Sequence, residues 1–244
     1  MFKFQKMGEL MNNKRISALR NGLIVSCQAM ENEPLFGAEL MAAMAVAAEE
    51  GGAVAIRANT PRDIARIKEA CSLPVIGLYK KQYPGYDVYI TPTMKEVDEI
   101  AAAGADFVAV DATGRVRPDG ANLREFAQAI RSRHPGVGIV ADVSTFEEGA
   151  AAMELDVDFV STTLSGYTPY SPQQEKPDTA LVARLSALKR TPVLAEGRIW
   201  TPEECVACLN AGAYAVVVGT AISRPQEITR RFVKAIQSAV DIRR

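Results

Sequence analysis

A short pattern that recurs four times along the 244-residue chain constrains its fold more than any other feature. Each copy begins with the end of a helix, which usually carries a glycine. A small residue and a short apolar strand follow. The copies are EEGGAVAIRANT, AAGADFVAVDAT, ELDVDFVSTTLS and NAGAYAVVVGTA. Glycine ends a helix readily because it adopts the left-handed backbone conformation without steric cost. The repeat therefore predicts that helices and strands alternate over most of the chain.

Four further apolar segments, GLIVSCQA, LPVIGLYK, PGVGIVADV and TPVLAEG, bring the number of expected strands to eight. Apolar residues in these segments are continuous rather than alternating, which is typical of parallel strands buried on both faces. The eight strands are expected to begin near Leu23, Val54, Val75, Phe107, Gly138, Phe159, Val193 and Ala215.

The segments between the strands carry strong helix start signals. A threonine precedes an acidic residue by three positions in four of them, at Thr60, Thr93, Thr145 and Thr201. In a capping box of this kind, side chains satisfy the unpaired amides of the first helical turn; the Thr60 case, with Asp63 as the acid, is a looser variant. These segments are therefore expected to be helices.

Eight strand–helix units in about 250 residues predict an α/β fold, the (β/α)8 TIM barrel. We expect one barrel domain over residues 22–244, preceded by an N-terminal extension over residues 1–21. The alternative, an open doubly wound sheet, more often carries a glycine fingerprint after its first strand. This chain has SCQAMENEPLFG at that point, so the barrel is favoured.

Composition excludes several classes of protein. The formal net charge is -1, and lysines and arginines are scattered, so the chain lacks the basic stripe of a nucleic-acid-binding protein. No apolar segment reaches the roughly 18 residues of a membrane span, and the start MFKFQKMGELMNNKR is too polar for a secretory signal. The four cysteines fit a reduced compartment better than a disulfide scaffold. We expect a cytoplasmic protein with neither nucleic acid nor membrane as a partner.

Polar side chains follow almost every expected strand. The carboxyl ends of the strands carry the chemistry in a TIM barrel, so the set as a whole predicts a site for a polar ligand, although any one residue could instead form a salt bridge or cap a loop. The set is Cys27, Gln28, Arg57, Asn59, Lys80, Lys81, Asp111, Thr113, Asp142, Ser144, Ser161, Thr162, Thr163, Glu196, Arg198, Gly219, Thr220, Ser223 and Arg224.

The last two strand ends are expected to bind phosphate. Gly197 and Gly219 let the backbone approach a ligand closely, and the loops after the seventh and eighth strands are the usual phosphate site of this fold. Helix N-termini near Thr220 would direct amides toward an anion. Arg224 could add a bidentate donor. Within a barrel, this pattern favours a phosphorylated ligand.

The single histidine and the CxxC sequence are interpreted as structural. His134 lies in RSRHPG at the end of an expected helix, on the face opposite the expected site. With no second histidine, imidazole-based metal sites and His-dependent triads are excluded. Cys205 and Cys208 fall within an expected helix, where packing explains them better than redox chemistry or zinc. A Mg²⁺ site of carboxylates and water has no supporting pattern, so no metal is expected.

Four residues then remain as candidates for proton transfer: Lys80, Asp111, Asp142 and Glu196. A lysine acts as a base near neutral pH only when desolvation or nearby positive charge lowers its pKa. Lys80 follows an apolar strand and Arg57 projects from the adjacent strand, so both influences are available, whereas Lys81 should point elsewhere. A base, a carboxylate and a phosphate clamp suit proton abstraction next to a carbonyl, as in phosphosugar isomerases and epimerases. Schiff-base aldolases, which also use a barrel lysine, are the competing interpretation.

Eight segments in order resemble one family. They are GLIVSCQA, AVAIRANT, PVIGLYKKQY, YITPT, FVAVDATGRVRP, VADVST, DFVSTTLSGYT and LAEGRIWTPEE…AGAYAVVVGTAISRPQEIT. Together, from about Gly22 to Phe232, they look like the N-acetylmannosamine-6-phosphate 2-epimerases of sialic-acid degradation. The resemblance implies interconversion of N-acetyl-D-mannosamine 6-phosphate and N-acetyl-D-glucosamine 6-phosphate by inversion at C2, without a metal or organic cofactor.

The resemblance also implies roles for individual residues. Lys80 matches the family's catalytic lysine, and Glu196 its glutamate at the seventh strand, which is the acid partner or polarises the substrate. Asp142 matches an aspartate that contacts a sugar hydroxyl or takes part in catalysis. The expected sugar-binding residues are Gln28, Arg57, Asp142, Ser161 and Thr163. The expected phosphate-binding residues are Gly197, Gly219, Thr220 and Arg224. Ser223 stands where the family more often has threonine, which keeps the hydroxyl.

Three matters stay open from the sequence. Inversion at C2 requires either one base that serves both faces or two groups, with Lys80 on one side. A Schiff-base lyase and a non-catalytic phosphosugar-binding barrel are the alternative functions. The C-terminal segment ITRRFVKAIQSAV has an apolar side that could pack against a partner, so a homodimer is expected.

Overall fold

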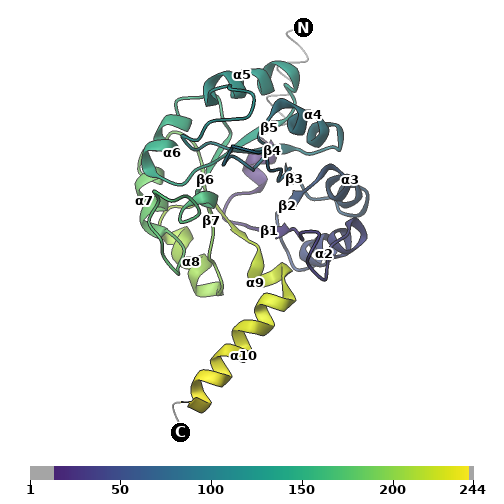
Figure 1. The fold of residues 1–244 in the computed structure, drawn as a ribbon, viewed down its shortest axis with the longest axis vertical. Coiled ribbons are helices and arrows are strands. Elements are labelled where there is room, and N and C mark those ends of the chain that lie inside the picture. Colours follow the sequence, from purple (N-terminus) through teal and green to yellow (C-terminus); the bar gives the residue numbers. More distant parts are fainter. Residues whose placement is uncertain (1–13, 242–244) are drawn as a thin grey trace.

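The computed structural model describes residues 14–241 and contains a closed barrel of eight parallel strands (Figure 1). The strands are β1 (Leu23–Cys27), β2 (Ala55–Asn59), β3 (Val75–Leu78), β4 (Phe107–Asp111), β5 (Gly138–Asp142), β6 (Phe159–Ser161), β7 (Val193–Glu196) and β8 (Ala215–Val218). Their order around the barrel follows the chain, and β8 pairs with β1 to close it. The predicted single-domain (β/α)8 barrel and its strand positions are therefore confirmed, and the doubly wound alternative is wrong.

Helices follow the strands and surround the barrel (Figure 1). They are α2 (Ala38–Glu50), α3 (Pro61–Ala70), α4 (Met94–Ala102), α5 (Leu123–Arg133), α6 (Phe146–Ala152), α7 (Thr179–Ser186), α8 (Pro202–Asn210), α9 (Thr220–Ser223) and α10 (Pro225–Asp241), with a 3-10 turn η1 (Thr162–Leu164) after β6. Residues 14–18 are also helical, whereas residues 1–13 of the predicted N-terminal extension lie outside the described residues.

The predicted helix starts are confirmed. Thr93, Thr145 and Thr201 each form a full capping box, in which the threonine accepts from a backbone amide of the first turn and a glutamate accepts from the threonine amide. Thr60 accepts from the amide of Asp63, as the looser variant predicts. A capping side chain of this type typically contributes about 1 kcal/mol to helix stability. These caps fix where each helix leaves its strand-end loop.

Side-chain alternation along each strand divides the core into two layers. On β3, Val75 packs outward against the helices, whereas Ile76 and Leu78 face the barrel interior. Phe107 and Phe159 meet edge to face inside the barrel, with ring centroids 5.6 Å apart. Successive side chains point to opposite faces of a strand, so every second residue faces the barrel interior. Along one strand, these interior-facing residues run from apolar ones deep in the barrel to polar ones at the carboxyl end. This register brings the polar strand-end residues to the mouth of the barrel.

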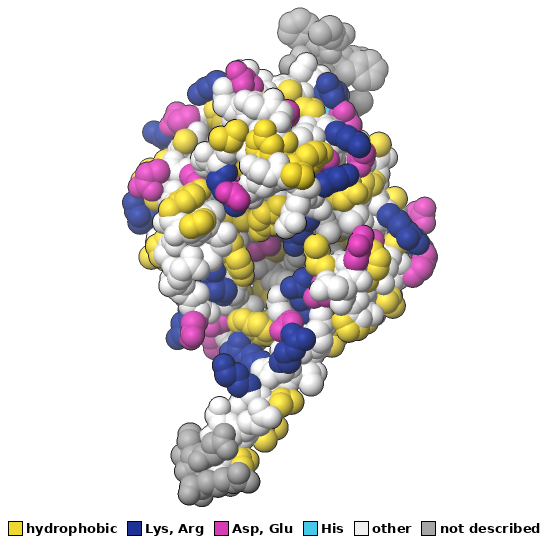
Figure 2. All heavy atoms as spheres, in the orientation of Figure 1, with side chains coloured by type: hydrophobic (Ala, Val, Ile, Leu, Met, Phe, Trp, Pro, Cys, Tyr) yellow, Lys and Arg dark blue, Asp and Glu magenta, His cyan; other side chains and the backbone are white. Residues whose placement is uncertain are grey.

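The C-terminal helix α10 projects away from the barrel (Figure 1). Its principal packing within the chain is against α9 at its base. Phe232 and Ile236 are 67% and 64% exposed, and Val233 and Val240 are also exposed on the same helix. Figure 2 shows hydrophobic side chains in the open along this helix. The amphipathic helix predicted from the sequence is confirmed, but its apolar face is not covered by the barrel.

Among residues 14–241, no helix is both long and apolar enough to cross a bilayer.

Candidate active site

A cavity of about 280 Å³ opens among the loops at the carboxyl ends of the strands. Figure 2 shows the hollow at the centre of this face, bordered by basic and acidic side chains. The predicted site residues that line the cavity are Gln28, Arg57, Lys80, Thr163, Glu196, Gly197, Gly219, Thr220 and Arg224. The remaining two, Asp142 and Ser161, are fully buried and contact the lining residue Thr163. The candidates for catalysis, sugar binding and phosphate binding therefore gather at one site. Several other strand-end residues do not line the cavity, among them the proton-transfer candidate Asp111, which pairs with Arg115.

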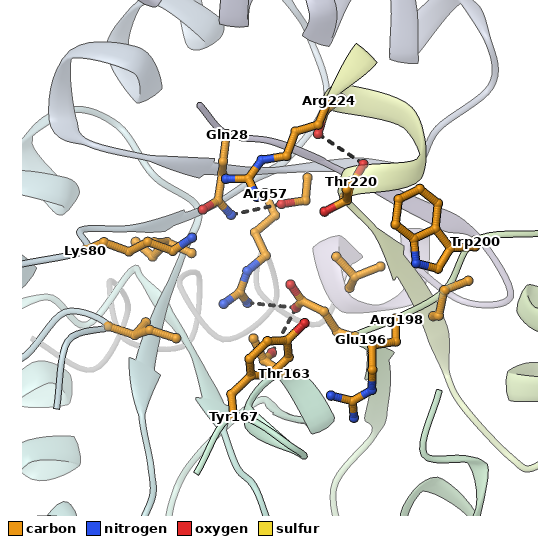
Figure 3. A pocket seen from close by; sticks show the side chains of 18 of the residues that line it. Gln28, Arg57, Lys80, Thr163, Tyr167, Glu196, Arg198, Trp200, Thr220 and Arg224 are labelled. Atoms are coloured by element: carbon orange, nitrogen blue, oxygen red, sulfur yellow. Dashed lines mark hydrogen bonds and ion pairs between the residues drawn. The ribbon is translucent and has the colours of Figure 1, made fainter. Parts of the chain in front are cut away.

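Lys80 enters the cavity directly after β3 (Figure 3). Its backbone amide donates to Asn59 Oδ1 at 2.8 Å, and it forms an antiparallel bridge with Ile90, so the chain is held where the side chain turns inward. Burial, followed by the positive charges of Arg57 and Arg224, lowers the pKa of Lys80 to about 8. The two influences predicted for this lysine, desolvation and Arg57, are therefore confirmed.

The neighbouring lysine takes a different direction. The ammonium of Lys81 lies 5.3 Å from the centroid of the Tyr79 ring, in a cation–π arrangement. Residues adjacent along an extended strand point to opposite sides, which explains why two consecutive lysines differ. The prediction that Lys81 points away from the site is confirmed, and Lys81 provides a natural comparison for Lys80.

Arg57 connects two carboxylates beneath the cavity. Its Nη2 lies 2.5 Å from Asp142 Oδ2 and its Nη1 3.2 Å from Asp142 Oδ1, a bidentate pair between side chains that are 1% and 0% exposed. The same Nη1 lies 3.4 Å from Glu196 Oε2. The two carboxylates hold the pKa of Arg57 above its usual value despite the opposing effect of burial. Arg57 is therefore a fixed positive charge between a buried aspartate and a cavity-facing glutamate.

The segment after β6 positions Glu196 through two adjacent threonines. Thr162 Oγ1 donates to the backbone carbonyl of Glu196 and accepts from its backbone amide, each at 3.1 Å. Thr163 Oγ1 lies 2.9 Å from Glu196 Oε2 and 2.7 Å from Asp142 Oδ1, and Ser161 Oγ lies 2.8 Å from the same hydroxyl. The two threonines directly after β6 thus hold both the backbone and the carboxylate of Glu196.

Gln28 presents an unpaired acceptor in the wall of the cavity. Its Nε2 donates to Ser26 Oγ at 2.9 Å, which fixes the orientation of the side-chain amide. Its Oε1 is buried and has no hydrogen-bond partner among the described residues. A buried acceptor without a partner costs about 1–3 kcal/mol, so this oxygen favours a ligand that carries an N–H or O–H donor.

The cavity has a second end at the β7 and β8 loops. Gly197 has a φ of 111°, a backbone conformation that favours glycine. Thr220 and Arg224 lie together at this end, away from Thr163 (Figure 3). Arg224 Nη2 is held by Glu33 Oε2 at 2.8 Å. The arrangement offers backbone groups, a hydroxyl and an oriented guanidinium to one anionic group.

Known proteins resemble this chain over most of its length. The family described as "Putative N-acetylmannosamine-6-phosphate epimerase" matches residues 41–238. A relative from Caldanaerobacter subterraneus subsp. tengcongensis, named "Putative N-acetylmannosamine-6-phosphate 2-epimerase", is 59% identical over 222 residues, which are 91% of this chain and 94% of the relative. A relative of the same name from Clostridium perfringens is 49% identical over 91% of this chain and its own full length.

A solved structure agrees with these relatives. The N-acetylmannosamine-6-phosphate 2-epimerase of Clostridium perfringens superimposes with a TM-score of 0.87 at 49% identity, covering 90% of this chain and 95% of that one. The chain belongs to the N-acetylmannosamine-6-phosphate epimerase family. A thiamine phosphate pyrophosphorylase from Pyrococcus furiosus, 16% identical with a TM-score of 0.55, shares the fold alone.

In this member of the epimerase family, several contacts around the cavity could not be predicted from the sequence. Asn59 and Thr162 are among the predicted strand-end residues, but their roles in holding Lys80 and Glu196 appear only in space. Tyr89 lines the cavity, and burial raises its pKa to about 12. Glu33, the partner of Arg224, lies 191 residues away in the sequence. The local sequence does not distinguish Glu33 from Glu31, which lies in the same loop.

The two features interpreted as structural are located as predicted. His134 is the C-cap of α5, and its Nε2 lies 2.7 Å from Asp98 Oδ1. Cys205 and Cys208 lie in α8, with Cys208 buried in the core and both thiols free. In the described part of this epimerase-family chain, no group of three or more His, Cys, Asp or Glu side chains is arranged to hold a metal ion.

Proposed function

We propose that this protein interconverts N-acetyl-D-mannosamine 6-phosphate and N-acetyl-D-glucosamine 6-phosphate by removing and returning the proton at C2. One observation carries the proposal. Lys80, with its pKa lowered to about 8, opens into the cavity together with Arg57 and Glu196. Members of its family named N-acetylmannosamine-6-phosphate 2-epimerase cover almost all of the chain, and epimerisation at C2 connects these two sugar phosphates.

The chemistry follows from the acidity of C2. That carbon loses a proton only when C1 is a carbonyl, so the reacting form is the open-chain aldehyde. The neutral amine of Lys80 takes the proton, and negative charge develops on O1. Arg57 and Glu196 lie where positive charge and a hydrogen bond can stabilise that oxygen, a form of stabilisation that is strongest in a site shielded from water. Return of the proton to the opposite face gives the epimer.

The rest of the substrate is bound by the other predicted residues. Thr220 and Arg224, with the backbone at Gly197 and Gly219, bind the phosphate. The unpaired Oε1 of Gln28 accepts a hydrogen bond from the sugar or its acetamido N–H. Asp142, Ser161 and Thr163 support this sugar-binding end from the buried side. The reaction needs neither a metal nor an organic cofactor, so activity should persist after dialysis against EDTA.

Exchange of the C2 hydrogen with solvent tests this proposal. In D₂O the wild-type protein should introduce deuterium at C2 of both sugar phosphates, detected by NMR. Lys80→Ala should stop the exchange while the substrate still binds, and Lys81→Ala should leave it unchanged. Absence of exchange by the wild type, or full activity of Lys80→Ala, contradicts the proposal. A covalent mass increase after borohydride reduction with the substrate would instead support a Schiff-base lyase, and binding without turnover a non-catalytic barrel.

A second experiment separates the one-base and two-base routes. If Lys80 serves both faces, part of the C2 proton should be returned to the product during single turnovers in D₂O. Glu196→Gln should then still form the epimer at a measurable rate. If Glu196 delivers the second proton, Glu196→Gln should wash deuterium into the starting sugar without forming the epimer.

We also propose that the protein is a homodimer whose interface includes α10. Phe232, Val233, Ile236 and Val240 give this helix an exposed apolar face, and helices with such a face gain stability by burying it. A second copy of the chain is the proposed partner, because each copy has an uncovered helix and also a barrel against which the helix of the other copy can pack. Ile236→Glu should reduce the mass measured by light scattering to that of a monomer, whereas Lys234→Glu, on the same helix, should not. An unchanged dimer in Ile236→Glu contradicts this interface.

The proposed location is the cytoplasm, where sugar phosphates are kept and thiols stay reduced. The four cysteines are free thiols. Fractionation of the native host, with detection of the protein in the cytoplasmic fraction, tests this assignment.

A further inference from the structure

The hydroxyl of Thr163 has more acceptors around it than it can serve. It lies 2.7 Å from Asp142 Oδ1, 2.9 Å from Glu196 Oε2 and 2.8 Å from Ser161 Oγ. A threonine hydroxyl donates one hydrogen bond and accepts two. It can therefore donate to only one of the two carboxylates. The other carboxyl makes a hydrogen bond to this hydroxyl only if it carries a proton and donates it.

The surroundings favour one proton on this pair of carboxyls. Burial, and then the nearby charge of Glu196, raise the pKa of Asp142, against the opposing effect of Arg57. Arg57 supplies one positive charge for the two carboxylates. On the β4 side the register places Asp111 beside Asp142, and Arg115 pairs with Asp111 at 2.5 Å, so that arginine is already engaged. Lys80, Tyr89 and Tyr167 are further titratable groups near the pair.

The two carboxyls also differ in their access to a ligand. Asp142 is 0% exposed and lies behind the cavity wall, whereas Glu196 lines the cavity and Thr163 stands between them. We propose that Thr163 is a proton-sharing residue, whose hydroxyl passes a single proton between the buried Asp142 and the cavity-facing Glu196. This inference rests on the proposed epimerase function for its chemical use, but the shared proton itself belongs to the unliganded protein.

The shared proton balances the proposed reaction. When the amine of Lys80 takes the proton from C2, the electrons of that C–H bond form the C1=C2 double bond, and the carbonyl electron pair moves to O1. The Thr163 hydroxyl takes the single proton from Asp142 and gives its own proton to Glu196, and Glu196 passes that proton to O1. Both carboxylates are then ionised, with Asp142 against the guanidinium of Arg57, and the reverse sequence restores the aldehyde when C2 is reprotonated.

Infrared difference spectroscopy of the unliganded protein at neutral pH tests the shared proton without any substrate. Subtracting the spectrum of Asp142→Asn from that of the wild type should reveal the C=O stretching band of one protonated carboxyl. The same band should be lost in Glu196→Gln, displaced in Thr163→Val and retained in Thr163→Ser. Identical carboxylic-acid bands in the wild type, Asp142→Asn and Glu196→Gln would overturn the proposal.

Kinetics with the isosteric pair of variants tests the use of the proton. Thr163→Val keeps the shape of the side chain but has no hydroxyl, so kcat should fall about a hundredfold, as expected for loss of one acid–base step, with KM little changed. Thr163→Ser, which keeps the hydroxyl, should recover most of the rate. Equal rates for the two variants would overturn the relay. Failure of the epimerase function itself would appear separately, as a wild-type protein without C2 exchange, and would leave the infrared result interpretable.

Discussion

Glu33 and Arg224 join the first and last loops of the barrel through one charged hydrogen bond. Arg224 Nη2 lies 2.8 Å from Glu33 Oε2, and the same oxygen accepts from the backbone amide of Met30 at 2.7 Å. Glu33 Oε1 accepts from Gln226 Nε2 at 3.0 Å. An arginine that is already oriented loses less conformational freedom when it binds an anion. Glu33 therefore holds the guanidinium of Arg224 oriented at the cavity, where we propose that it binds the phosphate.

The first prediction is that Glu33→Ala weakens binding of the phosphorylated substrate. Loss of a hydrogen bond to a charged group should raise KM about tenfold, or about 1.4 kcal/mol, with kcat little changed. Steady-state kinetics provides the measurement. Glu31→Ala, an exposed position in the same loop, is the control and should behave as the wild type. A fall in kcat without a rise in KM would mean that Glu33 acts on the chemical step instead.

The second prediction concerns Gly77, which lies in β3 three residues before Lys80. A Cβ at this position would lie 2.6 Å from Ile100 Cγ2 and 2.8 Å from Ile64 Cδ1, closer than packed atoms can approach. Gly77→Ala should therefore push α3 and α4 outward and lower the free energy of unfolding by about 1–3 kcal/mol, the usual cost of overpacking. Urea unfolding provides the measurement. Gly136→Ala, where a Cβ would meet nothing within 4 Å, should cost far less.

The fold could be predicted from sequence because its signals are local. Each strand is a continuous apolar run, and each capping box spans four residues, as Thr145 and Glu148 illustrate. The period of two along each strand then decides which polar residue faces inward, so Arg57 and Glu196 could be assigned to one site without coordinates. Asn122 and Glu125 form a capping box that the same rule could have found.

The contacts that a sequence could not reveal are those set by closure of the barrel. Glu33 reaches Arg224 only because β8 returns to β1. The three contacts of the Thr163 hydroxyl depend on the turn η1, which follows a strand of three residues and bends the chain toward β7. For α10 the sequence indicated an apolar face, but periodicity does not decide whether a helix packs on its own barrel or on a partner.

The third prediction concerns the buried pair of Arg57 and Asp142. Arg57→Ala should lower the free energy of unfolding by about 3–5 kcal/mol, because it leaves Asp142 buried without its partner. Adding Asp142→Ala should restore part of that loss, since residues in direct contact do not contribute additively. Chemical denaturation of the two single variants and the double variant provides the cycle. If the loss of stability in the double variant equals the sum of the losses in the two single variants, the coupling is contradicted.

The exposed ion pair between Arg66 and Glu39 is the control for this cycle. Its atoms are 2.8 Å apart, similar to the buried pair, but the side chains are 37% and 75% exposed. Water screens such pairs, and their contribution is about 0–1 kcal/mol. Arg66→Ala should therefore leave the free energy of unfolding almost unchanged, which separates the effect of burial from that of the ion pair itself.

The fourth prediction is a pH profile governed by Lys80, whose pKa is lowered to about 8 by burial and then by Arg57 and Arg224. Only the neutral amine can take the C2 proton, so kcat/KM should fall about tenfold for each pH unit below this value and level off above it. Initial rates between pH 6 and pH 9.5 provide the measurement. Arg224→Gln removes one nearby positive charge and should move the inflection to higher pH. A profile that is flat from pH 6 to pH 8 would exclude Lys80 as the base.

The same lowered pKa has a consequence for stability. Because the folded protein holds the Lys80 proton less tightly than the unfolded chain does, this residue destabilises the fold fully below about pH 8. The cost is relieved as the pH rises from about 8 toward the ordinary lysine value of 10.5. Lys80→Met should therefore raise the free energy of unfolding at pH 7 while abolishing turnover. Lys81→Met, whose ammonium lies over the Tyr79 ring, should show no such gain. A loss of stability in Lys80→Met would show that Lys80 is held in the site by favourable charge interactions.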